Sequence, residues 1–313
     1  MAGRRSGRVP RTAGTWWPPS PWRGDGVGSV WWCTGMAWRE ERPVLGWWAE
    51  GRGERGSELR VGEGLGFRVR GVRRCLGVWR GGRRTVCPER AEVGAGSTRA
   101  QCEECARLDR ARSVAADTMA DDPRAYAVYL AWFGPGMVKV GITREDRGPA
   151  RLLEQGAVAF TWLGRGPLMA ARRAEELLRS ALGVPDRVPY ARKRAVRGEL
   201  PPAGVRAAEL AEWHGRAVGL AGWPEALERA EFAVVDHGGV FRLAEAEWGG
   251  AGALVGGLRD GAVVAGRLVG AAGPDLHLAR EGSRRAVLVV DTRLMAGWQL
   301  DAAGRGRTPT GWR

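Results

Sequence analysis

The stretch "YAVYLAWFGPGMVKVGIT", residues 126–143, contains two apolar runs separated by Gly-Pro-Gly. Runs of aromatic and β-branched residues bounded by glycine and proline are typical of strands joined by a turn. The second run holds Lys139, one of two lysines among the 49 Lys and Arg residues of the chain. Because Val138 and Val140 flank Lys139, strand alternation directs it to the face opposite both. Lys139 is therefore a candidate site residue, with a solvated surface position as the alternative.

The sequence around this hairpin indicates a compact unit. Residues 124–200 are expected to form a domain of strand–strand–helix–strand–helix (ββαβα) order. A short helix through Leu152 is followed by a third strand over "AVAFTWLG" (157–164) and by a helix over "PLMAARRAEELLRSALG" (167–183). Proline near the start of that helix and glycine at its end occupy their favoured positions. The basic cluster "YARKRAVR" (190–197) is interpreted either as a solvated loop or as a track for phosphate groups.

The cysteines suggest a metal site. Four of the five are spaced Cys75-x11-Cys87-x14-Cys102-x2-Cys105. In a cytosolic protein this pattern favours a tetrahedral zinc site over disulfides, and four sulfur ligands would make that zinc structural. Two alternatives remain: a redox pair of Cys102 and Cys105, or buried thiols throughout. Cys33, in "CTG", is a further candidate for the place of Cys75, in "CLG".

The flanking segments complete an expected α+β fold. Residues 31–122 predict a β-rich zinc-binding module ending in a helix. Residues 201–313 predict a helical segment, with helices over 205–220 and 223–232, followed by a β-rich domain of the small barrel or sandwich type. Residues 1–30 consist largely of Arg, Gly, Pro and Trp without periodicity, and are expected to be a disordered or non-native extension.

The charge of the chain points to polyanions. The formal net charge is +14, and the excess lies before residue 201. Such an excess favours nucleic acid as a partner, because phosphate contacts gain from counterion release. Arginine in place of lysine, together with 49 Gly and 16 Trp, is also typical of a GC-rich genome. Neither a long apolar run nor a signal-peptide pattern is present, so a cytoplasmic location without a membrane partner is expected.

Tyr129 followed by Lys139-Val140-Gly141-Ile142-Thr143 resembles the two-strand signature of the GIY-YIG nuclease superfamily. The resemblance implies that Tyr129 and Lys139 lie near an attacking water. It also implies that Arg151 contacts phosphate and that Glu175 binds Mg²⁺ or Mn²⁺. The chain departs from the pattern because the usual Gly-Ile before the tyrosine is missing. Gln155 stands where a histidine often follows, and glutamine cannot transfer protons at neutral pH.

A broader resemblance extends from about Trp31 to Leu300. The cysteine segment, the "VKVGIT" core, "PDRVPYARKR" and the tail "VLVVDTRLMAGWQL" are similar to the bacterial DUF2797 family, whose function is unknown. Three functions are compatible with these observations. A zinc-containing nucleic-acid-binding protein is favoured; a metal-dependent phosphodiesterase or endonuclease and a protein-interaction scaffold with a vestigial nuclease fold are the alternatives.

Overall fold

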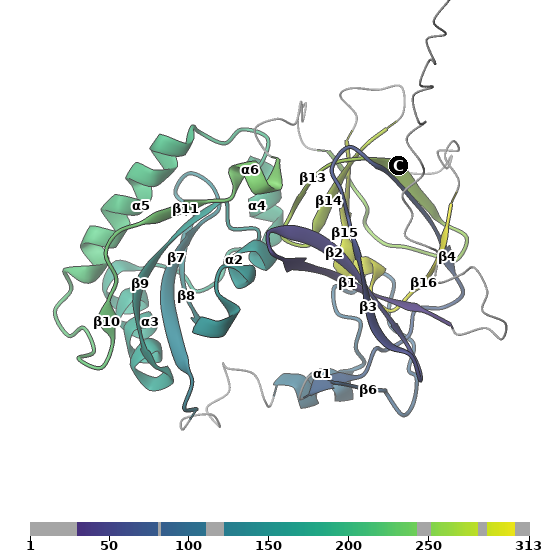
Figure 1. Cartoon of the computed structure of the whole chain (residues 1–313), viewed down its shortest axis with the longest axis horizontal. Coiled ribbons are helices and arrows are strands. Elements are labelled where there is room, and N and C mark those ends of the chain that lie inside the picture. Colours follow the sequence, from purple (N-terminus) through teal and green to yellow (C-terminus); the bar gives the residue numbers. More distant parts are fainter. Residues whose placement is uncertain (1–29, 81–82, 111–121, 243–251, 281–286, 304–313) are drawn as a thin grey trace, which may run out of the picture.

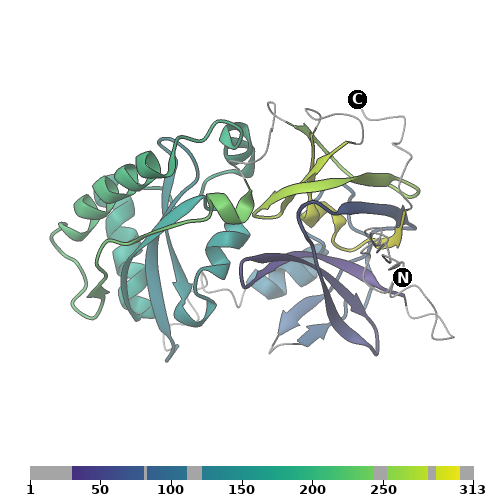
Figure 2. The ribbon, with the colours of Figure 1, turned by 45° about the horizontal axis from the view of Figure 1, so that its top comes forward.

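A computed structural model describes residues 30–80, 83–110, 122–242, 252–280 and 287–303 of the chain. The fold is mixed α+β with several sheets, as expected. We name its parts the α/β lobe (residues 122–242), the β lobe (30–70, 252–280 and 287–303) and the cysteine module (71–80 and 83–110). The two lobes lie side by side, and the cysteine module lies at the lower edge of the β lobe (Figures 1 and 2). The extension predicted at residues 1–30 falls almost entirely outside the described residues.

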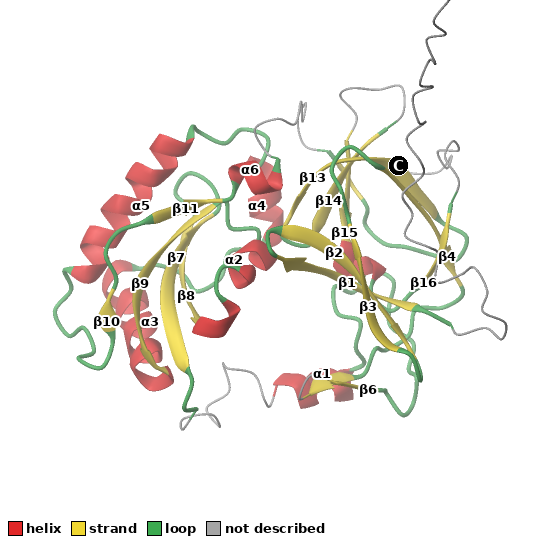
Figure 3. Ribbon diagram, in the orientation of Figure 1, coloured by secondary structure: helices red, strands yellow, loops and turns green. Residues whose placement is uncertain are grey.

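The α/β lobe is built on a five-stranded sheet, in which β7 lies between β8 and β9 and both β10 and β11 pair with β9. Helices cover the sheet (Figure 3). The strands are β7 (Ala125–Trp132), β8 (Val138–Arg144), β9 (Ala159–Pro167), β10 (Glu228–Arg229) and β11 (Val234–Asp236). The helices are η2 (Glu145–Arg147), α2 (Ala150–Gln155), α3 (Leu168–Leu182), α4 (Tyr190–Val196), α5 (Ala203–Val218) and α6 (Gly238–Phe241). The predicted ββαβα order is thus present from β7 to α3.

The helix predicted over residues 223–232 is wrong. This segment forms turns and the short strand β10, which pairs with β9. Gly164 and Gly166 of β9 make the pairing possible. A Cβ atom at Gly164 would lie 2.6 Å from the Glu228 carbonyl, and one at Gly166 would lie 2.3 Å from the Ala226 carbonyl. The close backbone approach to β9 therefore outweighs the helical propensity of the segment.

The β lobe contains two sheets. The first has the order β1-β2-β3, and the second has the order β12-β15-β14-β13-β4-β16. Their strands are β1 (Trp32–Arg39), β2 (Arg42–Ala49), β3 (Gly53–Glu58), β4 (Gly64–Arg70), β12 (Ala253–Leu254), β13 (Val263–Ala272), β14 (Asp275–Ala279), β15 (Val287–Asp291) and β16 (Gln299–Ala302), with helix α7 (Thr292–Met295) after β15.

The six-stranded sheet joins the two ends of the chain. Strand β4 pairs antiparallel with both β13 and β16. Segments 31–122 and 201–313 thus contribute strands to one sheet. Within the described residues this sheet is open, with β12 and β16 as its outer strands, so it is not the closed barrel that was one of the expected forms.

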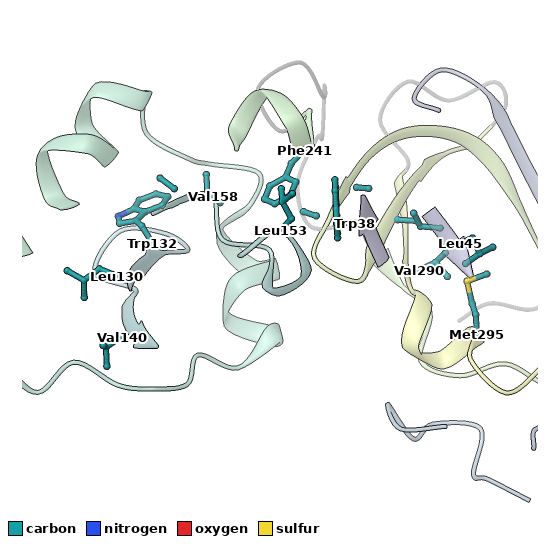
Figure 4. Packing of buried hydrophobic residues seen from close by; sticks show 14 of the residues in the cluster. Trp38, Leu45, Leu130, Trp132, Val140, Leu153, Val158, Phe241, Val290 and Met295 are labelled. Carbon is teal, nitrogen blue, oxygen red and sulfur yellow. The ribbon is translucent and has the colours of Figure 1, made fainter. Parts of the chain in front are cut away.

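Buried apolar side chains continue from one lobe to the other. Trp38 of β1 packs edge-on against Phe241 of α6, with ring centroids 5.2 Å apart. Leu153 of α2 lies beside this pair (Figure 4). In addition, the Trp38 indole N–H donates to the carbonyl of Gly273 at 2.9 Å. The lobes are therefore packed through a shared core.

The described residues contain no helix that combines the length and the apolar character needed to cross a membrane.

Candidate functional site

Four cysteines form a compact cluster in the cysteine module. The module consists of β5 (Val78–Arg80), β6 (Arg83–Thr85) and α1 (Glu103–Arg110), with loops between them. The sulfur atoms of Cys75, Cys87, Cys102 and Cys105 all lie within 4.8 Å of one another. The Cys87 and Cys102 sulfurs are 3.9 Å apart. Zinc–sulfur bonds of about 2.3 Å in a tetrahedron require sulfurs roughly 3.8 Å apart. The cluster could thus hold a metal ion such as zinc.

Backbone amides support one of these sulfurs. The amides of Gly77 and Cys102 point at the Cys75 sulfur, at 3.4 and 3.2 Å. Such N–H···S contacts stabilise negative charge on a thiolate. Gly77 has a positive φ of 73°, and a Cβ atom there would lie 1.9 Å from the Thr85 carbonyl. Glycine in "CLG" is therefore required by the turn that carries the first cysteine.

Cys33 lies outside the cluster. Its sulfur accepts the same kind of contact from the Gly35 amide, at 3.4 Å, so "CTG" and "CLG" form similar turns. Cys33 is fully buried in the β lobe, and this burial raises the pKa of its thiol to about 12. Cys33 is therefore not the ligand in the place of Cys75, because the clustered sulfur is that of Cys75.

The cysteine module is fixed to the β lobe by Arg73. Its side chain is 2% exposed, and its guanidinium donates to main-chain carbonyls on both sides. Two of these, Gly94 and Ser97, belong to the module, and two, Arg293 and Ala296, lie at α7. A buried charge satisfied by four carbonyls holds the two parts in one orientation.

A second group of candidate residues lies where β7, β8 and α2 meet. Tyr129 of β7 is opposite Gly141 of β8, and a Cβ atom at Gly141 would lie 2.4 Å from the Tyr129 hydroxyl. That hydroxyl accepts a 2.8 Å hydrogen bond from the Gln155 side chain. Burial is the main cause of the raised pKa of Tyr129. Gly141 therefore leaves the space into which the tyrosine extends, and Gln155 orients it.

Lys139 lies beside this tyrosine. Its ammonium is 5.6 Å from the Tyr129 ring centroid and donates to the Asp186 carbonyl at 3.2 Å. The residue is only 9% exposed, which excludes the solvated surface position. Burial, with a smaller contribution from the positive charge of Arg151, lowers the Lys139 pKa to about 8, while Glu175 and Asp186 act in the opposite direction.

Arg151 and Glu175 approach this position from two helices. Arg151, near the start of α2, is exposed and forms a 3.6 Å ion pair with Glu154. Glu175 of α3 is half-buried, and burial raises its pKa, opposed by the Lys139 charge. The Arg151 charge lowers the pKa of the Tyr129 hydroxyl, and the Glu175 charge raises it. The four residues singled out from the sequence therefore lie near one another at the β8 side of the sheet.

The burial of Lys193 was not predicted from the sequence. Its ammonium donates to the Gln155 carbonyl at 2.9 Å and lies 3.7 Å from the Phe133 ring centroid. Burial is the main cause that lowers its pKa to about 7, and the Lys139 charge contributes. The rarity of lysine, which drew attention to Lys139, also applied to Lys193. Its position within a cluster of arginines concealed that signal.

The cluster at residues 190–197 is neither a solvated loop nor an open phosphate track. It forms α4, and two of its arginines, Arg194 and Arg197, contact aspartates of the β lobe. Arg194 donates to Asp275 at 2.9 and 2.6 Å and to Asp291 at 2.7 Å. Arg197 donates to Asp275 at 2.5 Å. These buried ion pairs connect the lobes, and Lys193 on the same helix contacts the residue that orients Tyr129.

The fold and the two sites define a mixed α+β protein. It carries a cluster of four cysteines and a second group of polar residues on the five-stranded sheet of its α/β lobe. The chain belongs to DUF2797, described as a protein of unknown function, since the family's sequence model matches residues 62–300. The match begins after strands β1–β3, later than the expected start at Trp31. No curated protein matches the chain. No solved structure matches it either.

Proposed function

We propose that the protein binds nucleic acid, with Lys139 and Arg151 contacting a backbone phosphate and with zinc held by the four cysteines. The buried ammonium of Lys139 carries this proposal. Among the described residues it is hydrogen-bonded to a main-chain carbonyl and is in no ion pair with a carboxylate. A second cation, Arg151, lies close enough to lower its pKa. Two neighbouring cations beside the Tyr129 ring favour the binding of an anion.

The ion-pair partner of Arg151 is a weak competitor for a phosphate. The ion pair between Arg151 and Glu154 is 3.6 Å long and its arginine is 47% exposed. Exposed pairs of this kind contribute about 0–1 kcal/mol. A phosphate can therefore displace the pair at little cost. The formal charge of +14 favours the first encounter with a polyanion.

The proposal predicts a pH-dependent affinity. Lys139 must be protonated to bind phosphate, and its pKa of about 8 means that the charge is present below pH 8 and lost above it. We expect the affinity for DNA and RNA to fall as the pH rises from 7 to 9.5. Lys139→Arg should bind with a flat profile over this range, because a guanidinium stays charged. Fluorescence anisotropy with single- and double-stranded DNA and RNA measures this dependence.

Charge-matched variants provide the control for that experiment. Lys139→Gln and Arg151→Gln should each weaken binding by about 1.5–3 kcal/mol, as expected for a charge-assisted hydrogen bond. Arg216→Gln, which removes the same charge from α5, should bind as the unmodified protein does. Equal effects of all three variants would contradict a localised phosphate site.

Glu175 favours metal-dependent cleavage as a second candidate function. Its half-buried carboxylate is in no hydrogen bond or ion pair with a described residue. Mg²⁺ is commonly held by one or two carboxylates together with substrate phosphates, so Glu175 beside a phosphate site fits such an ion. The ion would supply Lewis-acid stabilisation of the phosphodiester. Tyr129, oriented by Gln155, and Lys139 would position the phosphate and the attacking water.

Incubation with Mn²⁺ separates binding from cleavage. If the protein is a nuclease, it should cut single- or double-stranded DNA or RNA when Mn²⁺ is present, and Glu175→Ala should abolish cutting. The variant should still bind, because the substitution removes a negative charge near the phosphate site. If the unmodified protein binds these nucleic acids but cuts none of them, the cleavage function is refuted and the binding function stands.

A further inference from the structure

Helix α2 is capped by side chains of α4. It spans only six residues, and a helix this short is not stable by itself. The last carbonyls of any helix also lack a partner within it. Here the Tyr190 hydroxyl donates to the Glu154 carbonyl at 3.1 Å, and the Lys193 ammonium donates to the Gln155 carbonyl at 2.9 Å. The end of α2 is therefore fixed by α4.

Lys193 is well suited to this capping role. A cation near the C-terminus of a helix interacts favourably with the helix dipole. Lys193 is buried, and its ammonium lies 3.7 Å from the Phe133 ring centroid and 4.5 Å from the Tyr190 ring centroid. The two rings hold the ammonium by cation–π contacts and direct it to the Gln155 carbonyl. Packing thus fixes both the donor and the carbonyl that it caps.

Helix α4 is in turn anchored to the β lobe. The residue after Lys193, Arg194, donates to Asp275 and Asp291. Arg197 donates to Asp275 as well. The cap on α2 is therefore supported by the buried ion pairs that connect the lobes.

The capped helix carries two groups of the proposed phosphate site. Arg151 lies near the start of α2, and Gln155 is its last residue. The Gln155 side-chain amide donates to the Tyr129 hydroxyl at 2.8 Å. The Lys139 ammonium lies 5.6 Å from the centroid of the same tyrosine ring. Gln155 therefore connects Lys193, through its main chain, to Tyr129, through its side chain.

We propose that Lys193 is a positioning residue for the phosphate site formed by Lys139 and Arg151. It contacts no phosphate itself. It holds the end of α2, so that the Gln155 amide meets the Tyr129 hydroxyl and Arg151 is presented in a fixed place. The inference rests on the proposed nucleic-acid binding and adds to it a buried group that acts only through Gln155.

Tyrosine NMR signals test the positioning in the absence of nucleic acid. The chain has three tyrosines, so protein labelled with 13C at the tyrosine ζ carbon gives three phenol signals. Lys193→Met keeps an apolar stem between the rings and removes the donor. It should shift the Tyr129 signal in the same direction as Gln155→Met, which removes the hydrogen bond directly. The Tyr126 signal should stay unchanged, because this residue belongs to a different apolar cluster. If Lys193 served packing alone, only the signal of Tyr190, whose ring it contacts, would move.

Binding measurements at fixed pH and salt test the consequence for the site. Fluorescence anisotropy with DNA and RNA should show that Lys193→Met and Gln155→Met each raise the Kd about 5-fold, as expected for the loss of one hydrogen bond. The double variant should bind no more weakly than either single variant, because both substitutions break the same connection. Arg192→Gln, which removes an exposed charge from the neighbouring position of α4, is the matched control and should bind as the unmodified protein does.

The outcomes separate the positioning role from the proposed function. An unchanged Tyr129 signal in Lys193→Met refutes the positioning role, and so do effects of the two substitutions on the Kd that add. Unchanged affinity of Gln155→Met also refutes it, and this variant leaves the cap on α2 intact. In each of these cases the proposed function stands if Lys139→Gln and Arg151→Gln weaken binding. If the unmodified protein binds none of the nucleic acids, both proposals are overturned.

Discussion

With zinc held by the four cysteines as proposed, replacement of Cys102 by serine is expected to release the metal and to unfold the cysteine module. Cys102 supplies one of four sulfurs that lie within 4.8 Å of one another, and its own amide contacts the Cys75 sulfur. Structural zinc contributes about 10–16 kcal/mol of apparent binding free energy in small domains, so losing a ligand removes the main stabilising interaction of the module. Metal analysis of the purified protein should give about one equivalent of zinc for the unmodified chain and much less for Cys102→Ser.

The best control is the fifth cysteine. Cys33→Ala removes a buried thiol in the β lobe that has the same N–H···S turn but lies outside the cluster. It should retain the full equivalent of zinc and lose only packing energy. Limited trypsin digestion adds a structural readout, because Arg83, Arg84 and Arg90 of the module should become cleavable in Cys102→Ser alone. Equal zinc content in both variants would refute a site formed by these four sulfurs.

The cysteine cluster and the β7–β8 hairpin were accessible from sequence because both depend on short-range patterns. The four cysteines were recognised by residue type and spacing, and the hairpin by its apolar runs around Gly-Pro-Gly. Strand alternation also directed Lys139 to the face opposite Val138 and Val140, and the observed pairing of Tyr129 with Gly141 places Lys139 on the same face as Tyr129. What such patterns could not provide was burial, since the Asp186 carbonyl that accepts a hydrogen bond from Lys139 comes from a later loop.

The pairing of β4 illustrates the limit of local patterns. Leu65, Phe67 and Val69 alternate with more exposed positions, so β4 is recognisable as a strand. Its partners, β13 and β16, come from the other end of the chain. Periodicity identifies the type of an element and its buried face, but it contains no information on which distant strand completes the ladder. The inward direction of Lys193 was not predictable for the same reason, because it is determined by Gln155 and Phe133, which lie far from it in the sequence.

Asp275→Ala is expected to cause the largest loss of stability among single substitutions at the junction of the lobes. The Asp275 side chain is fully buried and accepts hydrogen bonds from both Arg194 and Arg197. Arg197 is 2% exposed, so the substitution leaves a buried guanidinium without its counter-ion. Breaking one partner of a buried ion pair costs about 3–5 kcal/mol, because the remaining charge stays desolvated. Chemical denaturation of both proteins at neutral pH measures this difference.

A matched aspartate in the same sheet separates burial from charge. Asp301 of β16 pairs with Arg70, but both side chains are partly exposed, at 35% and 56%. Asp301→Ala should therefore cost less than about 1 kcal/mol. A comparable loss of unfolding free energy in the two variants would show that burial at Asp275 is not the cause of the effect.

Acidification should reproduce the Asp275 effect without a substitution. Burial alone would raise the Asp275 pKa, but Arg197 and Arg194 reverse this and hold it below its usual value. The folded protein therefore binds this proton less readily than the unfolded chain, whose aspartates have a pKa of about 3.9. The stabilisation is fully present above that pH and is lost as the pH falls below it. The stability difference between the unmodified protein and Asp275→Ala should accordingly be constant near neutrality and shrink below about pH 4. Because α4 also carries Lys193, which contacts the Gln155 carbonyl, the same loss should loosen the hydrogen bond that orients Tyr129.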